Sequence, residues 1–539
     1  MLEEKEHLNK IKYKMMFTKA GFNYLSVLFI TIYAFLINWI SANIGVMPID
    51  TFAFFDTGFS ILKNKLPIRD FWIFTGIVVD YFQAFFFWIF GENWSSYVLH
   101  ASFINIIGSL SFYFFLNNFK LDKKYSLVYT ISFATLCYPV SGTPFAYIHA
   151  YIFSLISIFL MCTAIKNKNS LSWFVIPVIS FFAFFSMQTP SVYIFLIIVL
   201  FSANFFLNQK DFKNFKMFIY GGACSVLFLI FFLFLSKTPI ENLLYQYFLF
   251  PLTIGGERLG SDTEAYVTLS SQLNFNRIFG DFKFIHIFYI PLIILTINSF
   301  WKKEKNLLRF INLIIIFSVL AFLFNQLVTA NQIYIFSLVP IIASILHLNI
   351  KEIKINRFFT YFIILVLCFV TIKFHLRYNI DRKFHDLENI DKTIAVDAGM
   401  ISKKMKNLKW ITPYSEPKKE IEIIKNAIDV IKSDERKKVL ITHYQFFSLV
   451  LNEDLNLLNR WYLWSNDTHP TESHKYFNFY KKMIDKSVEK NNIEVIYLLG
   501  QENEILFKHV KNYFTEKCFE SRTLIDTKFS SHKIIDCKN

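Results

Sequence analysis

The chain has 539 residues, of which 54% are hydrophobic and 18% are charged, and it carries a formal net charge of +15. A soluble protein of this length is about a quarter charged, so the composition excludes an ordinary soluble enzyme and predicts a polytopic α-helical membrane protein. The positive charge lies in short clusters between apolar runs and in the C-terminal region, with no continuous basic stripe. We therefore expect membrane lipids, and not nucleic acid, as its surroundings.

Eleven apolar runs approach the length of about twenty residues that a membrane-spanning helix needs. The first, 22–42, follows a basic N-terminus without a small-residue cleavage site, which predicts a retained helix and not a removed signal peptide. The other runs are 98–118, 126–138, 148–165, 171–187, 190–207, 217–236, 285–300, 309–328, 332–349 and 357–374. We expect about eleven transmembrane helices in a membrane domain formed by residues 1–376.

Lysine and arginine predict the orientation. If the eleven runs alternate across the bilayer, every basic cluster falls on one side, and the short turns 139–147, 188–189 and 329–331 on the other side have neither residue. Cytoplasmic loops are enriched in these residues. We therefore predict a bacterial cytoplasmic membrane protein with a cytoplasmic N-terminus and long outer loops at 43–97 and 237–284.

This orientation requires that the aromatic segment Gly76–Gly91 lies on the outer membrane surface as an interfacial helix. A short tilted span is the alternative, and it would reverse every later loop. The second outer loop, 237–284, has turn residues at its centre, including Gly255, Gly256 and Gly260. We expect a mobile loop there.

After Arg377 the composition becomes polar. Strand-like runs at 392–396, 439–442 and 494–499 alternate with helical patterns at 417–432, 473–489 and 503–516. This alternation predicts a small extracytoplasmic (periplasmic) α/β domain over residues 377–539. The loop Arg460–Pro470 in it is polar and aromatic, and it either stacks on sugars or simply packs.

The six cysteines include no CxxC pair, so the sequence gives no indication of a metal site. Cys518 and Cys537 are the only two cysteines in the C-terminal domain. Disulfides persist in oxidising compartments. We predict that these two cysteines form one if the domain lies outside the cytoplasm.

The first outer loop carries four carboxylates among aromatic residues. They are Asp50, Asp56, Asp70 and Asp80. A carboxylate at the boundary between water and lipid is costly to desolvate, so it needs a partner or a function. Asp50 opens a helical pattern and is a helix N-cap, a catalytic base, or both. Asp56 falls on the apolar stripe of that helix, with Lys63 or Arg69 as its ordinary partner, and Asp70 is expected to pair with Arg69.

The same loop has a specific order of residues. Asp50 is followed by Leu66-Pro67, by Arg69-Asp70-Phe71-Trp72, by Gly76 and by an aromatic segment that ends at Phe90-Gly91. This order resembles the first outer loop of the GT-C glycosyltransferases, in particular the branch with protein O-mannosyltransferases and lipid A aminoarabinose transferase. The resemblance covers residues 22 to about 210. Two departures are Thr51, where the family often has Glu, and Met187-Gln188, where many members have Lys followed by a polar residue.

The resemblance implies an inverting glycosyltransferase that moves a sugar from a polyprenyl-phosphate donor to a lipid-linked or cell-surface glycan acceptor. Asp50 would be the general base, and Asp56 is the second candidate for a catalytic carboxylate. The candidates for substrate binding are Arg69, Asp80, His100, His149 and Arg258. Cations among them would stabilise the phosphate leaving group. No cofactor is implied, and a divalent metal stays open.

Purely structural roles for these candidate residues also stay open. Arg258 can be a solvated loop charge, and His100 and His149 can be histidines satisfied inside the helix bundle. Two other classes of function also fit part of the sequence: a transporter or flippase of lipid-linked saccharides, and a membrane-anchored sensor or assembly protein that acts through its C-terminal domain. The sequence determines neither the sugar, the acceptor nor the oligomeric state.

Overall fold

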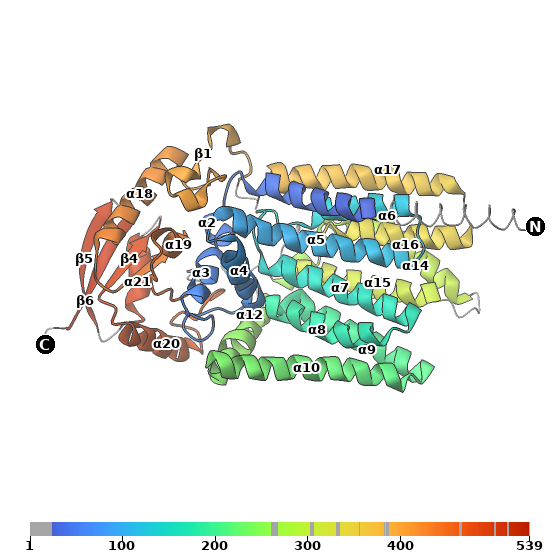
Figure 1. The fold of residues 1–539 in the computed structure, drawn as a ribbon, viewed down its shortest axis with the longest axis horizontal. Coiled ribbons are helices and arrows are strands. Elements are labelled where there is room, and N and C mark those ends of the chain that lie inside the picture. The colour runs from blue at the N-terminus through green and yellow to red at the C-terminus, as the bar shows by residue number, and fades with distance from the viewer. Residues whose placement is uncertain are drawn as a thin grey trace, which may run out of the picture.

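The computed structural model describes residues 24–259, 268–301, 307–329, 335–354, 356–381, 383, 387–462, 466–500, 503–514, 517–525 and 527–537. The chain forms two parts: a bundle of long helices that run side by side, and a smaller domain with a β-sheet at one end of the bundle (Figure 1). The short helices α2 and α3 and the helix α4 lie where the two parts meet.

Eight helices in the described residues are long and apolar enough to cross a membrane, which indicates a multi-pass membrane protein. They are Tyr24–Ala42, α5 (Trp94–Asn118), α7 (Ala146–Asn167), α9 (Gln188–Gln209), α10 (Phe212–Ser236), α14 (Lys283–Trp301), α15 (Leu307–Val328) and Arg357–Asp381, which comprises α17 (Arg357–Phe374) and the π-helical η3 (His375–Asp381). Three shorter helices coincide with the other expected spans: α6 (Lys123–Cys137), α8 (Ser170–Ser186) and α16 (Leu338–Ile353). Length and composition thus support eight of the eleven expected transmembrane helices.

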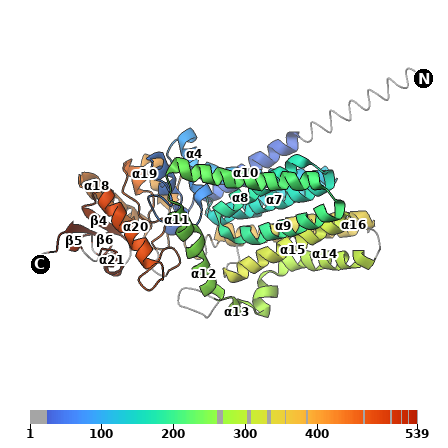
Figure 2. The same ribbon diagram turned by 90° about the horizontal axis from the view of Figure 1, so that it is seen from below.

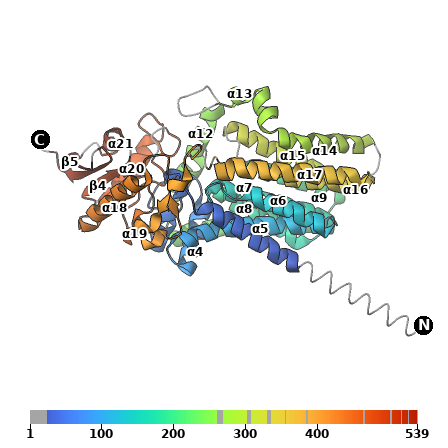
Figure 3. The same ribbon diagram turned by 90° about the horizontal axis from the view of Figure 1, so that it is seen from above.

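The outer surface of the bundle is apolar. Figure 2 shows α10 along one edge and α14 along the other, and Figure 3 shows α14 and the N-terminal helix on opposite sides. On α10, Phe231, Phe234 and Leu235 are 59%, 78% and 62% exposed. Exposed apolar surface of this extent is unfavourable in water and is expected on a surface that faces lipid.

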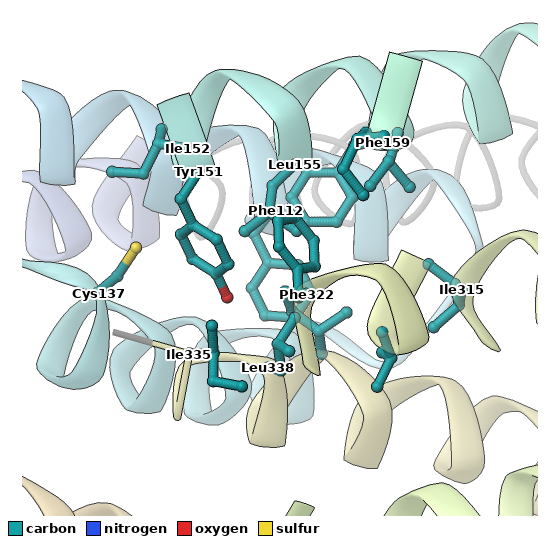
Figure 4. Packing of buried hydrophobic residues seen from close by; sticks show 14 of the residues in the cluster. Phe112, Cys137, Tyr151, Ile152, Leu155, Phe159, Ile315, Phe322, Ile335 and Leu338 are labelled. Carbon is teal, nitrogen blue, oxygen red and sulfur yellow. The ribbon is translucent and has the colours of Figure 1, made fainter. Parts of the chain in front are cut away.

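The centre of the bundle is α7, which is buried over most of its length. Figure 4 shows Tyr151, Leu155 and Phe159 of α7 among Phe112 of α5 and Phe322 of α15. The ring of Tyr151 packs on Phe322 at 4.8 Å between centroids. Interlocked aromatic side chains of this kind pack closely, and the resulting dispersion contacts stabilise the bundle.

Three helices of the first loop lie at the end of the bundle next to the C-terminal domain: α2 (Pro48–Thr51), α3 (Phe55–Leu62) and α4 (Ile77–Phe90). The segment Gly76–Gly91 thus forms a helix of 14 residues. Such a helix is about 21 Å long, shorter than the roughly 30 Å of hydrocarbon that a span must cross. Its length and its place at the end of the bundle (Figure 1) agree with a helix that lies on the membrane surface.

The second outer loop, 237–284, where the turn residues predict a mobile loop, is largely helical in its described residues. It contains α11 (Ile240–Leu243), the π-helical η1 (Leu244–Leu249), α12 (Phe250–Leu259), α13 (Leu269–Gln272) and the π-helical η2 (Asn276–Asp281). The turn residues Gly255 and Gly256 do not interrupt α12, because Phe250 and Ile254 are buried against Trp72 and the C-terminal domain. This burial outweighs the helix cost of Gly255 and Gly256, about 1 kcal/mol each. Gly260 lies outside the described residues.

The C-terminal part is the expected α/β domain. Its elements are η4 (Lys392–Ile394), β1 (Val396–Asp397), η5 (Ala398–Met400), η6 (Lys403–Met405), β2 (Lys409–Trp410), α18 (Pro417–Ser433), β3 (Lys438–Thr442), α19 (Phe447–Leu451), α20 (Phe477–Lys490), β4 (Val495–Leu499), α21 (Asn503–Lys511), β5 (Cys518–Ile525) and β6 (Phe529–Ile535). The main sheet has the order β3-β4-β6-β5, with β3 and β4 parallel and the other pairs antiparallel.

In this domain the structure differs from the sequence-based expectation at one strand and one hairpin and agrees with it at the disulfide. The strand expected at 392–396 is wrong for most of its length, because 392–394 form a 3₁₀ turn and only Val396 begins β1, which pairs with β2. The hairpin of β5 and β6 was not predicted, because exposed polar residues such as Glu520 and Arg522 hide its strand pattern. The predicted disulfide between Cys518 and Cys537 is present.

Candidate functional site

Asp50 lies shortly after the first described helix, Tyr24–Ala42, where the bundle meets the C-terminal domain (Figure 1). It is the third residue of α2, whose N-cap is Met47, so the N-cap interpretation is wrong. The side chain is half-buried. The indole N–H of Trp461, from the C-terminal domain, donates to the carbonyl oxygen of Ile49 at 3.0 Å. The neighbouring domain therefore fixes the backbone that carries Asp50.

Asp56, in α3, is buried and joins the loop to the C-terminal domain. Its carboxylate accepts hydrogen bonds from the backbone N–H groups of Ser448 at 3.1 Å and Leu449 at 3.0 Å, at the start of α19. The expected partners Lys63 and Arg69 are therefore wrong. Burial raises the pKa of Asp56 to about 7, although the two hydrogen bonds oppose that rise. This geometry caps a helix and leaves the carboxylate, 3% exposed, without access for a substrate.

Asp80, in α4, forms a fully buried ion pair with Arg460 of the C-terminal domain. The hydroxyl of Thr57 donates to the same carboxylate at 2.6 Å. Burial raises the pKa of Asp80, and the charge of Arg460 opposes that rise. Arg460 also donates to the carbonyl of Thr75 and lies over the ring of Phe54 at 4.4 Å. Asp80 thus holds the two parts of the chain together.

Gly76 makes room for this ion pair. Its φ is +81°, which a residue with a side chain rarely adopts, and a Cβ there would lie 2.7 Å from the guanidinium of Arg460 and from the ring of Phe54. The glycine of the family-like motif therefore has a packing reason in this chain.

His100 of α5 and His149 of α7 form one buried chain of hydrogen bonds. Their Nε2 atoms lie 2.9 Å apart, Nδ1 of His100 lies 2.9 Å from the amide of Gln83, and Nδ1 of His149 lies 2.8 Å from the carbonyl oxygen of Phe145. Nδ1 of His100 donates to the amide oxygen of Gln83, and Nδ1 of His149 donates to the carbonyl oxygen of Phe145. The two candidate residues meet each other, which the sequence did not predict, and protein atoms contact all four ring nitrogens.

Arg69 pairs with Asp70, as predicted. Its guanidinium contacts the Asp70 carboxylate at 2.6 and 2.8 Å and donates to the carbonyl oxygens of Ser236 at 2.9 Å and Asn64 at 2.6 Å. Lys490 of α20 donates to the other Asp70 oxygen at 3.2 Å. Arg69 therefore ties the first loop to the end of α10 and has little of its donor capacity left for a phosphate.

Arg258 lies in α12 and is half-buried. It is not among the residues that line the two cavities described below. Apart from the hydrogen-bonded pair of His100 and His149, the structure thus places the seven candidate residues in separate settings and not in one pocket.

Two cavities flank the first loop. The first, about 300 Å³, is lined almost entirely by apolar side chains of α4, α8 and α10, such as Tyr81, Phe182 and Phe232. The second, about 990 Å³, is a groove between α20 and the residues that follow α10. Ile68 lines the apolar cavity and Arg69 lines the groove, so the same turn of the first loop separates them. Asp50 lines neither.

Two features of these settings were missed from the sequence. Arg460 was assigned only to a polar-aromatic loop, and nothing in the local pattern of that loop indicates that it pairs with Asp80. The lysines of α20 that line the groove have the spacing of a solvated helix face. Among the described residues, no three His, Cys, Asp or Glu side chains are grouped in a way that could hold a metal ion.

The chain matches no protein-family model, and no curated protein gives a match. The likeness of the first loop to the GT-C glycosyltransferases therefore rests on the residues quoted above.

Proposed function

We propose that the chain is an inverting glycosyltransferase of the GT-C type that works on the outer face of a bacterial cytoplasmic membrane. The donor is a sugar on a polyprenyl phosphate, and the acceptor is a lipid-linked or cell-surface glycan. In this proposal all eleven helices cross the membrane and the C-terminal domain is periplasmic. The basic clusters support this orientation, and the Cys518–Cys537 disulfide suits an oxidising compartment.

The observation that carries the proposal is the setting of Asp50. Asp56 and Asp80 are 3% and 0% exposed and serve the contact between the two parts of the chain. Asp50 is half-buried at the same junction, next to the backbone that Trp461 fixes. A general base must be reachable by an incoming alcohol and held in place, and among these three carboxylates Asp50 has that combination.

The apolar cavity supports a lipid-linked donor. It lies among the end of α10, α8 and the surface helix α4, and its lining is aromatic and aliphatic. Apolar surface of this kind binds prenyl groups, since each buried CH₂ contributes about 0.8 kcal/mol. A donor anchored there has its phosphate at the level of the polar first loop.

The proposed reaction is a single displacement. Asp50 accepts the proton of the acceptor hydroxyl, whose oxygen forms a bond to C1 of the donor sugar. The bond between C1 and the phosphate oxygen breaks, and the electron pair leaves with the lipid phosphate. The configuration at C1 inverts. General base catalysis of this kind is worth about 10² to 10⁴ in rate.

The test compares Asp50→Asn with Glu92→Gln in vesicles that contain radiolabelled polyprenyl-phosphate hexoses and membrane glycolipids. Glu92 is a suitable control because it lies at the same junction and is paired with Lys404 at 3.2 Å. We expect turnover to fall at least about 100-fold in Asp50→Asn and to stay unchanged in Glu92→Gln. Wild-type turnover in folded Asp50→Asn protein would show that Asp50 is not the general base. Movement of intact lipid-linked saccharide across the vesicle membrane, without transfer, would favour the transporter alternative.

A further inference from the structure

The groove beside α20 has a basic lining. One wall is the face of α20 that carries Lys482, Lys486 and Lys490, and the opposite wall is formed by Arg69 and by the segment from Lys237 to Tyr245. Its volume, about 990 Å³, lies at the upper end of the range of roughly 300 to 1,000 Å³ for ligand pockets.

The protein neutralises this charge only in part, because six cations and two carboxylates, Asp70 and Glu241, line the groove. Asp70 pairs with Arg69 and Lys490, as described above. The other cations of the lining are Lys237, Lys475, Lys482 and Lys486. All four are exposed, and none has a carboxylate within 4.0 Å in the part of the chain that the structure describes. Lys482 and Lys486 are one helical turn apart, a spacing at which like charges repel, so a bound anion would stabilise this face.

The floor of the groove is aromatic. Tyr245 of η1 stacks on Phe479 of α20 with the ring centroids 4.1 Å apart and the planes at 12°. Tyr476 meets the same Tyr245 edge-on at 5.3 Å. The side-chain amides of Asn242 and Asn478 also reach the groove. Aromatic faces suit the C–H faces of pyranose rings, and amides suit their hydroxyl groups.

The number of cations decides between one phosphate and an extended anion. Among the described residues, the unpaired cations outnumber what one phosphate needs: Lys482 and Lys486 lie about 6 Å apart along the helix, and Lys237 and Lys475 line the same groove. Asp50 does not line the groove, so a ligand there lies away from the proposed reacting hydroxyl. Both facts favour a chain of charged units over a single headgroup.

We infer that the groove binds an anionic saccharide, a chain of sugars that carries carboxylate or phosphate groups, and that this chain is the part of the acceptor remote from the hydroxyl that receives the sugar. The role as acceptor rests on the proposed function. Binding itself does not, so the two are tested separately.

The test measures binding of a fluorescent oligogalacturonate to the full-length protein in zwitterionic nanodiscs. Its methyl ester serves as the uncharged probe of the same length. We expect the oligogalacturonate to bind at least tenfold more tightly than the ester, with an affinity that falls as salt is raised. Lys482→Glu/Lys486→Glu should weaken binding at least tenfold, and Lys482→Gln/Lys486→Gln should weaken it less.

The matched control is Lys418→Glu/Lys425→Glu, which makes the same change in charge at exposed positions of α18 in the same domain. It should bind as the wild type does. Equal binding of the ester, or equal loss in the control, would overturn the inference. Displacement of the probe by phosphatidylglycerol vesicles at equal charge would overturn it in favour of a lipid surface. Asp50→Asn should bind normally, so a failure of the proposed chemistry leaves this result intact.

Discussion

The two flanks of the first loop use charge in opposite ways. Toward the core of the C-terminal domain, the carboxylates of Asp56 and Asp80 are buried and receive hydrogen bonds from α19, Thr57 and Arg460. Toward the groove, Lys482 and Lys486 are exposed and have no carboxylate within 4.0 Å among the described residues. The first flank holds the domain against the bundle. The second flank presents the unpaired charges of Lys482 and Lys486 to the proposed ligand. Substitutions on the two flanks should therefore separate stability from binding.

The largest effect on stability is expected from Arg460→Met. This change leaves the carboxylate of Asp80 buried without its counter-ion, which typically costs about 3 to 5 kcal/mol. The free energy of unfolding in detergent measures it. Combining Arg460→Met with Asp80→Asn should restore part of the loss, because no charge is then buried. A single Arg460→Met variant as stable as the wild type would show that the ion pair does not hold the two parts together.

Asp56→Ala should have the next largest effect. It removes the acceptor of two backbone N–H groups at the start of α19, and loss of a helix cap costs about 1 to 2 kcal/mol. Asp429→Ala is the control, since Asp429 is exposed on α18. Equal unfolding free energies for the two variants would contradict the role assigned to Asp56.

The raised pKa of Asp56 also predicts that the stability of the fold depends on pH. Its pKa is raised from 3.8 to about 7 in the folded chain, so between these pH values the folded state binds more protons than the unfolded state does. The contribution of this group to stability is therefore fully present below about pH 4 and is lost as the pH rises through 7. Melting temperatures between pH 5 and 8 should show this slope, and Asp56→Asn should remove it. An unchanged slope in that variant would assign the dependence to another group.

The smallest effect on stability is expected on the groove flank. Lys482→Glu/Lys486→Glu alters only exposed side chains, so the free energy of unfolding should stay within about 0.5 kcal/mol of the wild type. Unfolding curves recorded beside the binding measurement check this. A loss above 2 kcal/mol would mean that these lysines serve the fold, and the contrast between the flanks would fail.

Much of the fold followed from local pattern. The positions of the long helices, the α/β character of the tail, the disulfide and the pairing of Arg69 with Asp70 depend on composition, periodicity or neighbouring residues, which a sequence displays directly. The helical segment Ile240–Leu259 was missed because the burial of Phe250 and Ile254 against a distant domain outweighs two glycines.

The partners of the candidate residues could not be predicted in the same way. Asp56 meets a backbone segment 392 residues away, and Asp80 meets Arg460 across 380 residues. Such pairs depend on how the domain docks on the bundle, and no local spacing encodes that. Asp50 could be singled out because its position shortly after an apolar run of spanning length is itself a local feature.

The central claim is that Asp50 serves chemistry while Asp56 and Asp80 serve the fold. The most direct test measures unfolding and glycosyl transfer on the same preparations of Asp50→Asn and Asp80→Asn. The account predicts that Asp50→Asn melts as the wild type does and loses transfer, whereas Asp80→Asn loses stability and keeps transfer in the fraction that stays folded. Full transfer by Asp50→Asn, or its unfolding, would contradict the claim.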